Sequence, residues 1–131
     1  MAIDLSEMAD RFAICRLNST SAVPYWATKG SFYSLTRTND ELSVLCRQDD
    51  VPGGVTCERA WRCLKVEGPL SLSLTGVLAS IIVPLGEAGI SILAIGAYET
   101  DYVLIKQDQY EEAIRVLKQS GHRINEGVVS L

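Results

Sequence analysis

The spacing of apolar residues predicts a helix over about residues 75–87. Its apolar positions recur at i, i+3, i+4 and i+7 and form a single stripe made of Leu78, Ile81, Ile82 and Leu85. Gly89 suits the C-terminal cap of this helix, because glycine readily adopts the left-handed backbone that such a cap needs. Pro84 lies inside the stripe and is expected to kink or end the helix locally.

A second helix is predicted from about residue 109 to residue 120. Asp108 followed by Glu111 is similar to a capping box, with Asp in place of Ser or Thr. Gly121 is expected to stop the helix. The buried stripe is predicted to be Tyr110, Ala113, Ile114 and Leu117.

Six further segments have the composition or the period-two alternation of strands. They are residues 12–17, 32–37, 42–47, 62–66, 90–95 and 102–106. Residues 38–41, Thr-Asn-Asp-Glu, predict a tight turn, and residues 51–54, Val-Pro-Gly-Gly, are the clearest break in the chain. The first half has only poor helices, since residues 23–29 are few and contain Pro24, and residues 58–61 make one turn at most.

A weak internal repeat relates the two halves of the chain. Residues 31–35 can be laid on residues 91–95, and residues 44–48 on residues 103–107, with a slip of one residue between the two matches. We therefore predict an α+β fold of two βαββαβ modules, with antiparallel sheets covered on one face by helices. Residues 1–60 would form the first, degenerate module and residues 61–131 the second.

The size and charge of the chain narrow the classes of protein to consider. Its 131 residues suffice for one ordinary domain or two very small ones, and 47% of them are apolar, enough for a packed core. The longest apolar stretch, residues 81–85, is far too short to cross a bilayer, and the acidic N-terminus has no apolar signal core. We expect a soluble cytoplasmic protein without a membrane partner. The formal charge of −4 and the scattered basic residues argue against nucleic acid as a partner.

The cysteines and the single histidine form no recognisable site in the sequence. Cys15, Cys46, Cys57 and Cys63 include no Cys-x-x-Cys pair, so neither a disulfide framework nor a metal site is expected. Free cysteine commonly behaves as a small buried apolar residue. His122 follows the second helix, where we expect it at the surface or as a partner of the helix dipole. We predict no catalytic residue, no metal and no cofactor, because a nucleophile would have only this histidine as its imidazole base.

The second half of the chain resembles an ACT domain, the small ferredoxin-like βαββαβ module that binds amino acids to regulate other proteins. The resemblance rests on residues 74–105, in which a helix opens at Thr75 and Gly76 and leads into a β-hairpin. The ACT motif usually places an acidic residue, then Pro-Gly, then an apolar pair at the mouth of the first helix. Gly76 matches this motif, whereas Ser73 replaces the acidic residue and Thr75 replaces the proline.

Most of the chain is also similar to the CASTOR-like branch of tandem ACT proteins, which includes the cytosolic arginine sensors of animals and many small bacterial proteins. The similarity is carried by residues 30–36, 41–45, 73–80, 84–90 and 98–104. The most specific part is the Tyr-x-Thr-Asp-Tyr hairpin that begins at Tyr98. Gly96 and Ala97 stand where relatives commonly carry hydroxyl residues, so the hydrogen bonds of those hydroxyls are missing.

The resemblance implies a ligand site at the mouth of the first helix and the neighbouring hairpin. Its expected members are Ser73, Thr75, Gly76, Val77, Tyr98, Thr100 and Asp101. A helix start has unpaired N–H groups and a positive dipole end, and Gly76 would let a carboxylate approach that backbone. Asp101 could bind an ammonium or guanidinium group. Simpler interpretations stay open: Thr75 as an ordinary helix cap, and Asp101 as a turn residue.

The function that the resemblance implies is a non-catalytic regulatory module that binds a small ligand, an amino acid by preference. The ligand would lie at an ACT–ACT interface, within the chain or across a homodimer, and would change assembly or the affinity for a regulated protein partner. An alternative is a protein–protein interaction scaffold with a decayed ligand site, which the departures at Ser73, Thr75, Gly96 and Ala97 favour. An enzyme is the least favoured class, because no set of acid, base and nucleophile can be positioned from the sequence.

Overall fold

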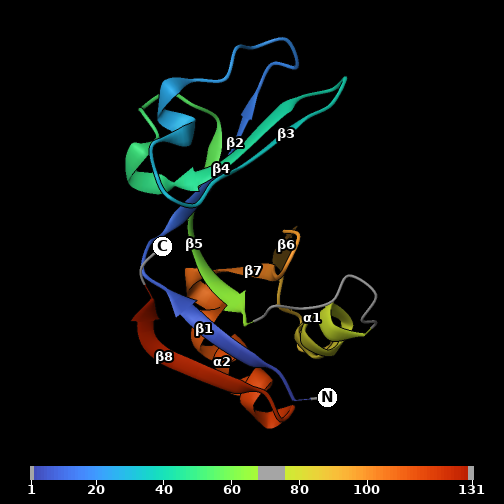
Figure 1. Ribbon diagram of the computed structural model, residues 1–131. Coiled ribbons are helices and arrows are strands. Elements are labelled where there is room, and N and C mark those ends of the chain that lie inside the picture. The colour runs from blue at the N-terminus through green and yellow to red at the C-terminus, as the bar shows by residue number, and fades with distance from the viewer. Residues whose placement is uncertain (1, 68–75, 130–131) are drawn as a thin grey trace. The chain divides into compact units, whose positions relative to one another are not determined.

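The computed structural model describes residues 2–67 and 76–129, and the chain divides into two compact units (Figure 1). Residues 10–61 form the N-terminal unit, whereas the chain up to Ala9 and from Arg62 onward forms the C-terminal unit. This differs from the predicted module ranges, which assign all of the first sixty residues to one module. The difference arises because strand β1 (Asp4–Met8) pairs with strands of the C-terminal unit.

The C-terminal unit has the predicted βαββαβ element order. The second part of β5 (Cys57–Val66) is followed by α1 (Val77–Glu87), β6 (Ile92–Gly96), β7 (Asp101–Lys106), α2 (Tyr110–Gln119) and β8 (Arg123–Val129). A short 3₁₀ turn, η3 (Gln107–Gln109), leads into α2. The order of strands in the sheet is β8-β1-β5-β7-β6. The predicted antiparallel pairing is observed for β1 with β5 and for β6 with β7, whereas β1 and β8 are parallel.

Both helices of the C-terminal unit cover one face of its sheet. Val77, Ile81 and Leu85 of α1 share a buried core with Tyr110, Ala113 and Leu117 of α2 and with apolar residues of the strands, namely Leu5, Leu64, Val66, Val103 and Ile105. Leu78 and Ile114 of the predicted stripes are partly buried against the same core. The α+β class and the helical cover on one face are thus confirmed.

The two helices end in the same way. Gly89 and Gly121 have φ angles of +77° and +95°, in the left-handed region that glycine adopts without steric cost. The N–H of the residue after each glycine donates back to the last turn, from Ile90 to Leu85 and from His122 to Leu117, each at 3.0 Å. This pattern is the Schellman cap, so both predicted glycine stops are confirmed.

The N-terminal unit is the degenerate module. It contains β2 (Phe12–Leu17), β3 (Ser34–Arg37), β4 (Leu42–Arg47) and the first part of β5, in the order β3-β4-β2-β5 and all antiparallel. In place of α-helices it has two 3₁₀ turns, η1 (Tyr25–Thr28) and η2 (Gln48–Asp50). Its core is formed by Ala13, Cys15, Trp26, Ala27, Leu42, Val44, Cys46 and Val51.

The helical turn predicted for residues 58–61 is wrong, because these residues belong to β5. In the antiparallel register with β2, Glu58 pairs with Ile14 and Trp61 with Phe12. The register shifts between these two pairs, and Ala60 lies at the shift with φ of +66°. Such a β-bulge places an extra residue opposite the partner strand, which disturbs the alternation that would have marked the strand in the sequence.

Candidate functional site

Five of the predicted site residues lie in the C-terminal unit: Gly76, Val77, Tyr98, Thr100 and Asp101. The other two, Ser73 and Thr75, lie outside the described residues. The five come from two places in the fold, the N-terminus of α1 and the hairpin that joins β6 to β7.

Gly76 is the N-cap of α1 and needs to be glycine. Its φ of +80° lies in the left-handed region, and a Cβ added there would meet no atom of the described residues within 4 Å. The first helical hydrogen bond runs from the Ser80 N–H to the Gly76 carbonyl at 2.9 Å. The N–H groups of the first turn therefore have no helical acceptor and lie at the positive end of the helix dipole. An open glycine at this position allows an anion to approach them closely.

At the N-terminus of α1, Val77 can offer a ligand its backbone N–H but not its side chain. Its side chain is buried in the core of the C-terminal unit with Ile81 and Leu85. A ligand at the start of α1 would meet the Val77 N–H and not its isopropyl group.

Thr100 fastens the hairpin to the end of β5. Its hydroxyl donates a hydrogen bond to the carbonyl oxygen of Val66, the last residue of that strand. The Glu67 N–H, one residue further along, donates to the Asp4 carbonyl at 2.8 Å. Thr100 is therefore a positioning residue, because it places the start of β7 beside the point from which the chain leads toward α1.

Asp101 is the first residue of β7 and directly follows Thr100. It pairs with Gly96 across the hairpin, and a Cβ at Gly96 would lie 3.5 Å from the Asp101 Oδ1. The Asp101 side chain is half-buried, and within the described part of the chain no hydrogen bond or ion pair engages its carboxylate. Tyr98, in contrast, lies in the hairpin turn closed by the Ala97 N–H and the Thr100 carbonyl and is 79% exposed. The structure thus joins Thr100 to the end of β5, places Asp101 directly after it at the start of β7, and leaves Tyr98 in solvent.

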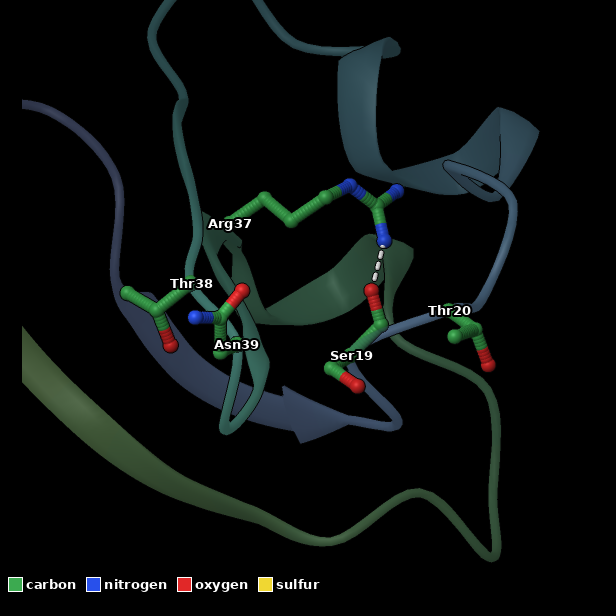
Figure 2. Close-up of a pocket in the computed structure, with 5 residues that line it drawn as sticks. All are labelled: Ser19, Thr20, Arg37, Thr38 and Asn39. Atoms are coloured by element: carbon green, nitrogen blue, oxygen red, sulfur yellow. Dashed lines mark hydrogen bonds between the residues drawn. The ribbon is translucent and has the colours of Figure 1, made fainter.

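A polar hollow in the N-terminal unit escaped the sequence analysis. It has a volume of about 690 Å³ and is lined by Ser19, Thr20, Arg37, Thr38 and Asn39 (Figure 2). The Arg37 guanidinium donates to the carbonyl oxygens of Ser19 and Ser21, the latter at 2.6 Å. Because these carbonyls already engage the cation, the hollow is best explained as the place where Arg37 joins a loop to the β3–β4 hairpin. Only the tight turn at residues 38–41 was visible in the sequence.

A second group that the sequence did not reveal is a buried ion pair in the C-terminal unit. The Arg62 Nη2 lies 2.5 Å from the Glu7 Oε1, and the guanidinium carbon lies 4.0 Å from the centre of the Tyr110 ring. The Arg62 Nη1 also donates to the Gln107 side chain at 3.3 Å. Burial, and secondarily the nearby Glu7 charge, raise the pKa of Tyr110 above its usual value. This group ties β1, β5 and the start of α2 together.

Comparison with known proteins places both units in described families. A family model for the ACT domain matches residues 56–119, and a model for an N-terminal domain matches residues 10–54. The chain is 26% identical over 97 residues to the cytosolic arginine sensor for mTORC1 subunit 1 of Bos taurus, and 25% identical over 99 residues to that of Homo sapiens. These matches cover 66% and 67% of the chain but only 30% of each sensor.

Solved structures share the fold. An Agobacterium tumefaciens protein is 33% identical with a TM-score of 0.93, over 100% of this chain and 98% of that one. The regulatory subunit of aspartate kinase from Thermus flavus is 13% identical with a TM-score of 0.63, over 92% of this chain and 99% of that one. The latter likeness shows the fold alone. Taken with the family matches and the βαββαβ architecture, these similarities show that the chain belongs to the ACT-domain family and is similar to the cytosolic arginine sensors.

Proposed function

We propose that this protein is a non-catalytic regulatory module that binds an amino acid at the start of α1. The observation that carries the proposal is the N-terminus of α1 at Gly76, inside an ACT domain. Gly76 is a left-handed glycine, and no atom of the described residues lies within 4 Å of a Cβ added there. A relative of the chain is named as a cytosolic arginine sensor, which supports a role in amino-acid regulation.

The chemistry of recognition follows from the two ends of an amino acid. The ligand carboxylate would accept hydrogen bonds from the Val77 N–H and its successors, where the helix dipole favours negative charge. The ligand ammonium would lie against the carboxylate of Asp101 in a charge-assisted hydrogen bond. Ser73 and Thr75 would add hydroxyl contacts, Thr100 would hold the hairpin in place, and Tyr98 would close over the ligand.

The proposed assembly is a homodimer with the ligand at an ACT–ACT interface. Among the described strands, β6 pairs only with β7, and its sequence Ile-Leu-Ala-Ile-Gly carries no charge and no proline. An uncharged edge strand of this kind offers free backbone groups to another strand. Ligand binding would then change the dimer or its affinity for a regulated protein partner. No described helix is long and apolar enough to span a membrane, and we propose a cytoplasmic location.

A thermal-shift screen against the proteinogenic amino acids, with the oligomeric state measured in parallel, tests the proposal. A ligand that binds only the folded protein raises the melting temperature according to its concentration relative to its dissociation constant. The shift should disappear in Asp101→Asn and persist in Asp108→Asn, an exposed aspartate of the same unit that serves as the matched control. A selective shift that survives Asp101→Asn would move the ammonium site elsewhere, and no shift at millimolar concentrations would overturn the proposal.

One observation favours the alternative, an interaction scaffold with a decayed ligand site. Tyr98 is 79% exposed in the β6–β7 turn, beside Gly96 and Ala97, whose side chains offer no hydroxyl group to a ligand. Exposed tyrosines are enriched where proteins bind one another. A protein partner whose binding depends on Tyr98 and does not respond to any amino acid would support the scaffold.

A further inference from the structure

The N-terminal unit gathers three of the four cysteines on neighbouring strands. Cys15 of β2 pairs directly with Cys57 of β5, and Cys46 of β4 pairs with Ala13, two residues from Cys15 along β2. Side chains two residues apart on a strand share a face, and all three cysteines pack in the same core cluster. None of them belongs to the proposed amino-acid site, so their chemistry needs a separate explanation.

The backbone pairing of Cys15 with Cys57 is of a kind that a disulfide can bridge. The Arg16 N–H donates to the Thr56 carbonyl at 2.9 Å, so this neighbouring pair occupies a hydrogen-bonded position of the antiparallel ladder. The two kinds of position alternate, which makes Cys15–Cys57 a non-hydrogen-bonded pair, with Cα atoms typically ~4.5 Å apart. Disulfides span Cα separations of about 4.4–6.8 Å. Cys46 is diagonal to Cys15, and diagonal neighbours lie farther apart, at about 7–8 Å.

The three thiols differ in their exposure to solvent. Cys57 is part-exposed, whereas Cys15 and Cys46 are each 1% exposed. The neighbouring Cys46 thiol, and secondarily burial, raise the pKa of Cys15, whereas Cys15 lowers the pKa of Cys46. Cys57 is therefore the thiol that reagents reach first.

We propose that Cys15 and Cys57 form a redox modification site that takes a low-molecular-weight disulfide as substrate and becomes a cross-strand disulfide between β2 and β5. This goes beyond the proposed regulatory function and uses none of its residues.

The reaction takes place in two exchange steps. The Cys57 thiolate attacks the small disulfide, so that one sulfur of the reagent joins Cys57 and the other leaves as a thiolate. Cys15 then attacks the Cys57 Sγ, and the bound half of the reagent leaves and takes up the Cys15 proton, so that it departs as a thiol. Two protein thiols are oxidised to one disulfide, and one small disulfide is reduced to two thiols. The new bond closes the chain between residues 15 and 57 and stabilises the sheet of the N-terminal unit.

Oxidised glutathione with the full chain tests this site. Intact mass should first show one glutathione adduct and then a species lighter than the starting protein by two hydrogens. Peptide mapping without reduction should find Cys15 joined to Cys57 in the wild-type protein. The melting temperature should rise on oxidation and return to its starting value when dithiothreitol reduces the disulfide, which serves as the control.

Matched variants assign each thiol. Cys15→Ser should stop at the adduct on Cys57, and Cys57→Ser should form neither adduct nor disulfide. Cys46→Ser and Cys63→Ser should both retain the Cys15–Cys57 bond, the latter because burial raises the pKa of Cys63 to about 12. An adduct on Cys57 that never resolves in the wild-type protein, or a disulfide that is lost with Cys46, would overturn the assignment. Peptide mapping of the wild-type protein tests the Cys15–Cys57 bond even where a variant does not fold.

Discussion

The Nε2 of His122 lies 2.8 Å from the carbonyl oxygen of Ser80, which is the acceptor that Pro84 leaves without a helical donor. In an α-helix this carbonyl would receive the N–H of the residue four positions later, and proline has none. The other ring nitrogen, Nδ1, accepts a hydrogen bond from the Ile3 N–H at 3.1 Å. One buried imidazole therefore lets α1 continue through Pro84 to Glu87 and fastens the start of the chain to the same unit.

Replacing this imidazole should destabilise the protein. His122→Ala leaves the Ser80 carbonyl and the Ile3 N–H without partners, and we expect a loss of about 2–3 kcal/mol in the free energy of unfolding. Urea denaturation measures this loss. The matched background is Pro84→Ala, whose new N–H can reach Ser80, so the cost of His122→Ala there should fall by about 1 kcal/mol. An equal loss of stability in both backgrounds would show that His122 does not compensate for the N–H that Pro84 lacks.

Breaking the buried ion pair should cost more than breaking an exposed one. Arg62→Leu leaves Glu7 largely buried and uncompensated, so we expect a loss of about 3–5 kcal/mol in stability. The control is Lys118→Gln, which removes an ion pair with Glu126 whose side chains are 50% and 56% exposed and should cost less than about 1 kcal/mol. Chemical denaturation of both variants gives the comparison, and similar losses would contradict a structural role for Arg62.

Replacing Gly86, within α1, and Gly89, just after it, by alanine should change the stability of the protein in opposite directions. Gly89 has φ of +77°, so Gly89→Ala should reduce stability by about 1 kcal/mol. Gly86 lies within α1, and no atom of the described part of the chain is within 4 Å of a Cβ added there, so Gly86→Ala should increase stability by about 0.5–1 kcal/mol. Thermal melts of the two variants measure the signs, and a stabilising Gly89→Ala would contradict the Schellman cap.

Stability should fall at alkaline pH through Cys63. Burial raises the pKa of this thiol from 9.0 to about 12, so the folded protein holds a proton that the unfolded chain loses. The stabilisation is complete below pH 9 and is lost as the pH rises toward 12. The contribution to the slope is up to about 1.4 kcal/mol per pH unit. Urea denaturation between neutral and alkaline pH should show a shallower fall in Cys63→Ala than in the wild-type protein, and parallel curves would contradict the assignment.

Prediction from the sequence worked where the signal is local. The strands at 12–17 and 42–47 have the predicted bounds, and both helices end at the predicted glycines. These features depend on alternation, periodicity and caps within a few residues. Two strands were missed, because β1 has five residues and β8 reads Arg-Ile-Asn-Glu-Gly-Val-Val, a mixed pattern with an internal glycine.

The candidate site was only partly accessible to the same reasoning. The left-handed Gly76 before a helix and the hairpin at Asp101 could be expected from the motif. The role of Thr100 could not, because its acceptor is Val66, 34 residues earlier in the chain. Arg62 and Glu7 are separated by 55 residues, and no local pattern indicates that they meet.

The sequence by itself determined the two helices of the C-terminal unit, their ends and the class of fold, since these follow from hydrogen bonds and apolar contacts among near neighbours. Only the tertiary structure decided that β1 enters the C-terminal sheet, that His122 is buried rather than exposed, and that Cys15 faces Cys57. Each of these depends on groups far apart in the chain, such as Ile3 and His122 with a separation of 119 residues. Their meeting is fixed by sheet register and core packing, which the complete fold establishes.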